Sequence, residues 1–191
     1  MFLRSRTLKQ LGIASGLVLS FWTSSRGARA QTEEEARAAA RLLGIEGIRL
    51  AKDGHCDQAI DKLDRANRLF HAPTIVVQLA ECQILMGQLV EGTEKLNGVV
   101  REDLGPNPSP AYVQAQARAR QLLEATLPRI ATLTVDVKAP AGATVELAVD
   151  GRPVSDALIG VARPIDPGKH SLVARVEGYE PASASVELAE A

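Results

Sequence analysis

Apolar residues recur at helical spacing from about residue 32 to residue 127, and small residues mark the same places twice. Moving the sequence around Gly47 forward by 33 residues places it on Ala80, and places Gly54 on Gly87. A period of this length is typical of helix–turn–helix repeats, which stack so that neighbouring repeats bury one continuous core. The pattern therefore predicts two helical hairpins, followed by one further helix that covers the open end.

The expected helix boundaries follow from capping and breaking residues. Thr32 followed by Glu35 fits a capping box, and Gly54 ends the first helix. Pro73 and Pro110 suit the first turn of a helix, because the missing N–H of a proline has no partner to lose there. The five predicted helices cover residues 32–53, 56–70, 73–86, 89–101 and 110–127, and residues 102–109 form a turn-rich linker. The apolar positions expected on the fifth helix include Val113, Ala117, Leu123 and Leu127.

After Pro128 the pattern changes from helical to alternating. Alternating runs cover about residues 132–137, 145–149, 172–176 and 182–188, and Gly-containing turns separate them. Asp150-Gly151 is typical of a two-residue hairpin turn, and Pro153 makes the returning strand short or places it at a sheet edge. The sequence thus predicts an α+β chain in two segregated parts, a helical domain over residues 31–127 and a small all-β sandwich over residues 128–191.

The connection between the two parts is predicted to be short. Pro128 disfavours helical geometry at Leu127, and the first strand begins by Ile130. A connector of this length cannot act as a free tether. We therefore expect the sandwich to sit directly on the end of the fifth helix, with Leu127 and Ile130 buried where the halves meet.

The first thirty residues predict a secretory signal peptide. Residues 1–10 carry basic residues and no acid, and residues 11–22 are largely apolar, a run too short for the roughly 20 residues that span a bilayer. The stretch ends in Ala28-Arg29-Ala30, so cleavage is expected between Ala30 and Gln31. The mature chain is therefore expected in the periplasm or secreted, with no transmembrane segment.

Composition narrows the classes of partner. The expected signal peptide holds five of the 22 basic residues and none of the 23 acidic ones, so the mature chain has 17 basic residues against 23 acidic ones. An excess of acid repels phosphates, so no nucleic-acid partner is expected. Phe70, Tyr112 and Tyr179 are the aromatic residues that remain, which is few for a surface that stacks on bases or sugars.

The helical part resembles tetratricopeptide repeats. In that family a small residue on the first helix of a hairpin faces small and large apolar residues on the second helix. The residues that match this frame are Gly47, Ala59, Leu63 and Ala66 in the first hairpin, and Ala80, Gly92 and Leu96 in the second. The resemblance covers about residues 36–101 and implies a curved array whose first helices line a partner-binding face. The polar residues expected on that face are Arg41, Gln78 and Gln83.

The β part looks like a PEGA-type domain. The resemblance rests on the turn at residues 166–170, the alternating run at residues 172–176, and Gly178-Tyr179-Glu180-Pro181. It implies an exported bacterial protein whose β domain is an envelope interaction module with no enzymatic activity of its own. Tyr179 is expected to be structural, with its ring over a strand and its hydroxyl bonded to backbone, and ligand contact is the alternative.

Few residues are candidates for a disulfide, a metal site or a catalytic site. Cys56 and Cys82 are the two cysteines, and in an exported protein they predict a disulfide, the alternative being two free thiols buried between helices. His55, His71 and His170 lack the spacing of a helical metal pair, and His170 follows a β-turn where it packs or forms hydrogen bonds. No nucleophile elbow or phosphate-binding glycine loop is present, so no catalytic residue, metal or cofactor is expected.

Taken together, these features predict an exported, non-catalytic adaptor or scaffold of the bacterial cell envelope that holds a protein or peptide partner. A module that binds carbohydrate, such as peptidoglycan or another envelope glycan, is the alternative. Its weakness is that Tyr179 is the one aromatic residue in the β part.

Overall fold

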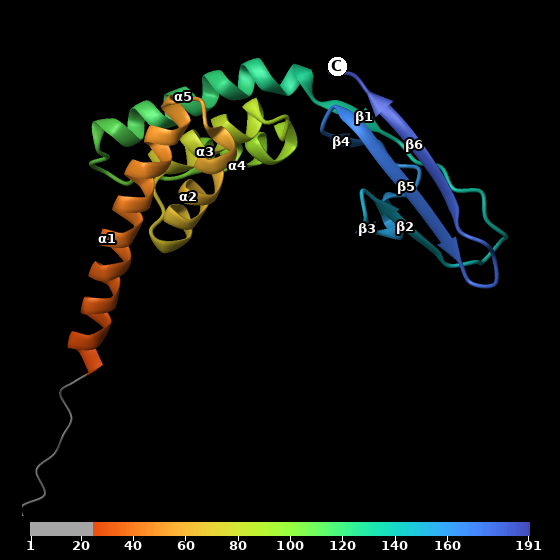
Figure 1. Ribbon diagram of the computed structural model, residues 1–191, viewed down its shortest axis with the longest axis horizontal. Coiled ribbons are helices and arrows are strands. Elements are labelled where there is room, and N and C mark those ends of the chain that lie inside the picture. The colour runs from red at the N-terminus through yellow and green to blue at the C-terminus, as the bar shows by residue number, and fades with distance from the viewer. Residues whose placement is uncertain (1–24) are drawn as a thin grey trace, which may run out of the picture.

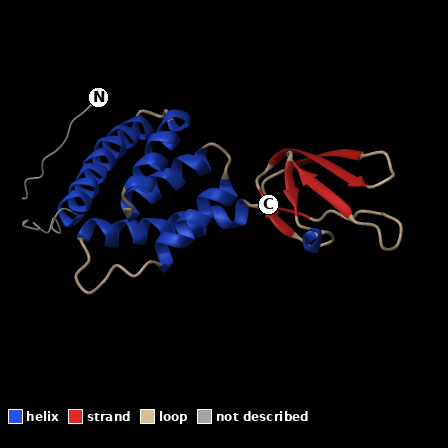
Figure 2. Cartoon of the chain, turned by 90° about the horizontal axis from the view of Figure 1, so that it is seen from below, coloured by secondary structure: helices blue, strands red, loops and turns tan. Residues whose placement is uncertain are grey.

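A computed structural model of the chain describes residues 25–191, and the side chains from residue 32 onward. Figure 1 shows the helices gathered in one part of the molecule and the strands in the other, and Figure 2 shows the same segregation from below. The predicted α+β arrangement in two parts is therefore confirmed. The helices are α1 (Ser25–Lys52), α2 (Cys56–Leu69), α3 (Pro73–Leu85), α4 (Leu89–Arg101) and α5 (Pro110–Thr126).

The start of α1 differs from the prediction. The helix begins at Ser25, so Thr32 lies inside it and the predicted helix start at Thr32 is wrong. A capping pair favours a helix start at its own position, but it does not prevent the helix from beginning earlier in the chain. The expected cleavage site after Ala30 therefore falls within α1, and the first 24 residues of the expected signal peptide lie outside the described residues.

At other helix ends, the residues predicted to begin or end a helix do so. Pro73 and Pro110 each occupy the first turn of a helix, and Ser109 Oγ accepts a hydrogen bond from the Tyr112 N–H at 3.3 Å. Gly54 and Gly87 have φ values of 84° and 82°, a left-handed conformation that favours glycine just after a helix. These residues turn the chain back, so that α1 pairs with α2 and α3 pairs with α4.

In each hairpin the two helices make their closest contact at a glycine. A Cβ atom on Gly47 would lie 2.7 Å from Leu63 Cγ, and one on Gly92 would lie 2.7 Å from Ile84 Cγ1 and 3.0 Å from the Ala80 carbonyl oxygen. Any larger residue would therefore push the paired helices apart. The predicted packing positions Ala59, Leu63, Ala66, Ala80 and Leu96 are all fully buried.

A disulfide joins the two hairpins. Cys56 is the first residue of α2 and Cys82 lies on α3, and their Cα atoms are 5.0 Å apart. Both residues are buried beside Leu79 in the core that α1, α2 and α3 share. The predicted disulfide is confirmed, and the alternative of two free thiols is wrong for this structure.

Helix α5 covers the end of the second hairpin, and its buried residues include Leu123 of the four predicted apolar positions but not the other three. Its buried residues are Ala115, Ala119, Leu123 and Thr126, whereas Val113 and Ala117 are exposed. The buried stripe follows spacings of three and four residues, and the small residues allow α5 to lie close to α4. Gln116 Nε2 donates to three carbonyl oxygens at the end of α4, those of Val99, Val100 and Glu102, at 3.0–3.2 Å.

The β part contains two antiparallel sheets. Strands β1 (Ala131–Leu133) and β4 (Arg163–Ile165) form one, and the other has the order β3-β2-β5-β6. The strands of the larger sheet are β2 (Val145–Val149), β3 (Arg152–Val154), β5 (Gly168–Val176) and β6 (Ala182–Leu188). Asp150 and Gly151 have φ values of 52° and 73°, as a two-residue hairpin turn requires, and β3 is short and lies at a sheet edge as Pro153 predicts.

The sequence predicts that Leu127 and Ile130 are buried at the junction, and this is wrong for Leu127 and only partly met for Ile130. Leu127 begins the short 3-10 helix η1 (Leu127–Arg129), and 51% of its surface is exposed, so it is not buried between the halves. Thr126 takes the inward position, because it continues the buried stripe of α5 from Ala119 and Leu123. Ile130 is partly buried, and β1 begins immediately after it.

The C-terminus returns to this junction. Arg129 forms a two-pronged ion pair with Glu190, with Nε–Oε2 and Nη2–Oε1 distances of 3.0 and 2.7 Å. The Ala191 N–H also donates to the Arg129 carbonyl oxygen at 3.4 Å. Figure 1 shows the chain end beside the point where α5 gives way to β1. The last residues therefore brace the connection between the two parts.

Candidate binding face

A groove lies between α3 and α5. Val77 and Ala115 are buried and form its apolar floor. The groove is shallow and wide open to solvent, with a volume of about 360 Å³, and the other residues that line it are Thr74, Gln78 and Glu81 of α3 and Ala111, Gln114 and Arg118 of α5. An apolar floor with a polar rim is the lining that a peptide segment needs, since the floor buries its apolar side chains and the rim bonds its backbone.

An ion pair crosses the groove. Arg118 Nη2 lies 2.5 Å from Glu81 Oε1, and both side chains remain partly exposed. A pair of this kind contributes about 0–1 kcal/mol to stability. The two helices are held together mainly by the buried core that they share, which includes Val77, Ala80 and Ala119.

Helix α1 supplies the next part of the same surface. Ile45 is 62% exposed, and it lies 33 residues before Gln78, so it occupies the equivalent place on the first hairpin. Gly44 lies against Ile75 of α3, which brings this side of α1 next to α3. The exposed isoleucine adds an apolar position on α1, outside the residues that line the groove. The 33-residue offset, applied to Gln78, would have identified Ile45 from the sequence.

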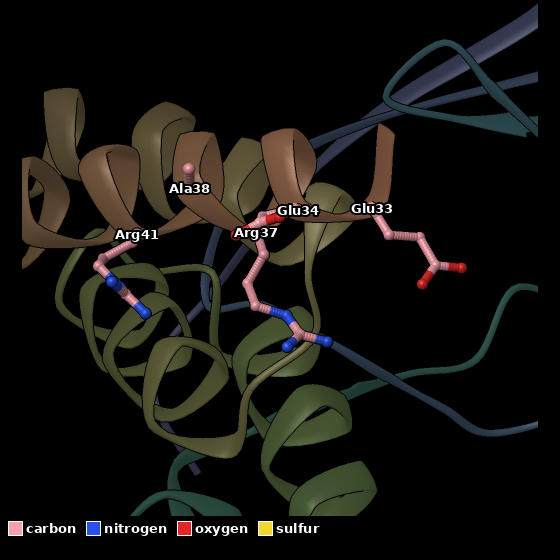
Figure 3. A pocket seen from close by; sticks show the side chains of 5 residues that line it. All are labelled: Glu33, Glu34, Arg37, Ala38 and Arg41. Atoms are coloured by element: carbon pink, nitrogen blue, oxygen red, sulfur yellow. The ribbon is translucent and has the colours of Figure 1, made fainter. Parts of the chain in front are cut away.

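Arg41 lines a separate hollow on α1, shown in Figure 3. The guanidinium groups of Arg37 and Arg41 extend from the same side of the helix. The guanidinium carbon of Arg37 lies 4.7 Å from the centre of the Phe70 ring, a cation–π contact between α1 and the end of α2. Both arginines are exposed on α1, and Arg37 differs from Arg41 in its contact with Phe70.

The three predicted partner contacts do not meet in one cavity. Gln78 lies in the groove and Arg41 lies in the hollow on α1. Gln83 is only 2% exposed, so its prediction as a partner contact is wrong. Gln83 follows Ala80 by three residues and Leu79 by four, and this spacing places it on the buried stripe of α3. There its side chain bonds to Glu91 of α4 and contributes, after Lys95, to lowering the pKa of that carboxyl group.

Tyr179 is also placed differently from the prediction. It lies in the turn between β5 and β6 and is 63% exposed, so its ring is not packed over a strand. Its backbone N–H donates to the Val176 carbonyl oxygen at 3.1 Å, and its side chain borders a shallow hollow with Glu146, Arg175 and Pro181. The ring is therefore available for contact with a ligand.

The histidines are separated in space as in sequence. His55 precedes α2, and His71 lies between α2 and α3, where its ring nitrogens bond Asn67 and Glu102 at 2.9 Å. His170 lies on β5 and bonds Asp150 and Asp166, as the sequence predicts for a histidine after a turn. Within residues 25–191 no group of three His, Cys, Asp or Glu side chains is placed to hold a metal ion. No helix of the described part is both long and apolar enough to cross a bilayer.

Comparison of the chain with family models, curated proteins and solved structures finds no match.

Proposed function

We propose that the chain is an exported, non-catalytic adaptor of the bacterial cell envelope that holds a peptide segment of a partner protein on the face formed by α1, α3 and α5. The observation that carries the proposal is the groove between α3 and α5, with its buried apolar floor at Val77 and Ala115 and its polar rim. The resemblance of the helical part to tetratricopeptide repeats supports the same face.

The disulfide supports export. Cys56 and Cys82 are bonded to each other, and disulfides persist in oxidising compartments such as the periplasm and the extracellular space. The predicted signal peptide agrees with this location. A tetratricopeptide-like scaffold joined to a PEGA-like domain then has two surfaces, one for the partner and one for a second contact in the envelope.

The test is to fill the groove without disturbing the fold. Ala111 is exposed and lines the groove, so Ala111→Arg places a long charged side chain over the apolar floor. Ala117→Arg makes the same substitution at an exposed position of α5 that does not line the groove. Partners are captured from an envelope extract by chemical cross-linking and identified by mass spectrometry.

We expect Ala111→Arg to reduce capture of a specific protein at least tenfold, with Ala117→Arg unchanged. Thermal unfolding of both variants checks that their stability matches. If the wild-type protein captures no protein that Ala111→Arg loses, the groove is not a partner site and the proposal fails.

Glycan binding is the second candidate, and the exposed ring of Tyr179 is the observation that favours it. An exposed aromatic ring stacks on the apolar face of a sugar, and the neighbouring Arg175 and Glu146 offer hydrogen bonds to hydroxyl groups. Co-sedimentation with purified peptidoglycan tests it directly. Retention of the wild-type protein that Tyr179→Ala abolishes, and that Ala111→Arg leaves intact, would favour glycan binding over the adaptor role.

A further inference from the structure

A side chain of the β part caps helix α4 of the helical part. Gln88, which precedes α4, makes no side-chain cap, and the Val90 N–H instead donates to Asp166 Oδ1 at 2.7 Å. Asp166 lies in the turn between β4 and β5, 76 residues later in the chain. A carboxylate at this position satisfies a free amide and complements the helix dipole. The bond is a second link between the halves, separate from the covalent connection at η1.

His170 holds the turn that carries Asp166. Its Nε2 lies 2.8 Å from the Asp166 carbonyl oxygen, and its Nδ1 lies 2.7 Å from Asp150 Oδ2. His170 is only 8% exposed, so the ring itself is largely shielded from water. A carbonyl and a carboxylate both accept hydrogen bonds, so both ring nitrogens must donate. An imidazole carries two N–H groups only when it is protonated.

Asp150 is fixed independently of His170. Its Oδ1 accepts the Ser171 N–H at 2.8 Å, and its own N–H donates to the Ser171 carbonyl oxygen at 2.8 Å. These bonds anchor the carboxylate between the β2–β3 turn and β5. The imidazolium therefore connects a fixed carboxylate on one side with the capping turn on the other.

We propose that His170 is a proton-operated latch between the two parts of the molecule. Protonated, it ties the Asp166 turn to Asp150 and keeps the Asp166 carboxylate on the N-terminus of α4. When the ring loses its proton, one nitrogen can no longer donate, one of the two bonds is lost, and the cap on Val90 opens more often. The β part then moves more freely about η1.

The charges around the ring support this assignment. The hydrogen bond with Asp150 raises the pKa of His170, burial opposes it, and the bond to the Asp166 carbonyl raises it further. The same bond from His170, followed by the Ser171 amide, lowers the pKa of Asp150. Both shifts favour the charged pair, which is the form that makes both hydrogen bonds.

Charged groups from three other elements also line the cleft around His170. Arg152 of β3, Arg163 of β4 and Glu91 of α4 line the cleft between the two parts. The pKa of Glu91 is lowered, first by its bond to Lys95. From β6 the residue in register with His170 is Val186, which is apolar. Among the described residues that line the cleft, His170 is the one histidine, the side chain whose ordinary pKa lies nearest neutrality.

The pH window follows from the directions of the two shifts. Because the pKa of His170 is raised, the latch is complete below the ordinary histidine value of about 6.5 and is lost as the pH rises through the raised value. Because the pKa of Asp150 is lowered, its contribution is complete above the ordinary value of about 3.9 and is lost only in stronger acid. The latch is therefore closed in mild acid and opens toward alkaline pH.

The Val90 amide reports the latch directly. In the 15N-labelled full-length protein, its hydrogen-exchange protection factor is measured from pH 5 to pH 9, with each rate divided by the intrinsic rate at that pH. The His170 ring carbons give its titration in the same samples. We expect Val90 protection to fall about fivefold through the His170 titration, the effect of losing one helix cap. The Tyr112 amide is the control, since Ser109 caps it within the helical part.

Two variants separate the steps. His170→Gln removes the titrating group, so Val90 protection should stay low and show no step with pH. Asp166→Ala removes the cap alone, so Val90 protection should be low at every pH while His170 still titrates with a raised pKa beside Asp150. A wild-type Val90 amide whose protection does not change through the His170 titration would overturn the latch. The latch concerns the joint and not the groove, so it stands or fails separately from the adaptor role.

Discussion

At the scale of single residues, contacts that require a small side chain are visible in the sequence, whereas the surroundings of a polar side chain are not. Gly47, Ala80 and Gly92 are found from the 33-residue offset, because each hairpin needs small residues where its helices touch. Gln83 is misplaced when polarity alone is considered, although its phase relative to Ala80 places it inside. The bond from Val90 to Asp166 has no local sequence signal, since its partners are 76 residues apart.

Two glycines of α4 allow a matched test of close packing. A Cβ on Gly92 meets Ile84 and the backbone of Ala80, whereas a Cβ on Gly98 meets nothing within 4 Å. We expect Gly92→Ala to destabilise the protein by about 1–3 kcal/mol through overpacking. Gly98→Ala should stabilise it by about 0.5–1 kcal/mol, because alanine is the better helix former. Urea unfolding of the two variants checks the opposite signs, and equal effects would contradict the packing argument.

At the scale of elements, the helices are predicted better than the strands. Helices α2 to α5 begin where the sequence places them, because proline, glycine and serine act on the residues next to them. A strand needs a partner, and the partner is not local. Residues 134–138 alternate as a strand does but form none, and β4 (Arg163–Ile165), which contains a proline, pairs with β1 without having been predicted.

The disulfide is the covalent link between elements, and its removal should be measurable. Cys56 and Cys82 are separated by 26 positions in the sequence, and closing a loop of this size stabilises a protein by about 3–4 kcal/mol through the unfolded chain. We expect the double substitution of both cysteines by serine to lower the free energy of unfolding by that amount. Guanidinium unfolding with and without reductant measures it. Reductant should lower the stability of the wild-type protein and leave the double variant unchanged.

At the scale of the whole molecule, two parts that share no core are held by a few polar contacts. The parts meet through η1, through the Arg129–Glu190 ion pair and through the Asp166 cap on α4. The short connector is predicted from Pro128, but the ion pair is not, because it joins residues 61 positions apart. Interfaces of this kind permit limited motion between domains. The position of the β part relative to the proposed binding face therefore depends on contacts that single substitutions can remove.

Limited proteolysis measures how firmly the joint is held. Residues 102–109 form an exposed loop, whereas residues 127–131 pass through η1 and are braced by Glu190. A non-specific protease such as subtilisin cuts where the backbone is mobile, so we expect cleavage within residues 102–109 before cleavage within residues 127–131. Glu190→Ala should speed cleavage at the junction several-fold, because it frees Arg129. Glu187→Ala is the matched control on β6, since its contact with Lys169 is long and exposed. Mass spectrometry of the early fragments gives the order, and a first cut at the junction that releases an intact β part would show that the joint is not braced.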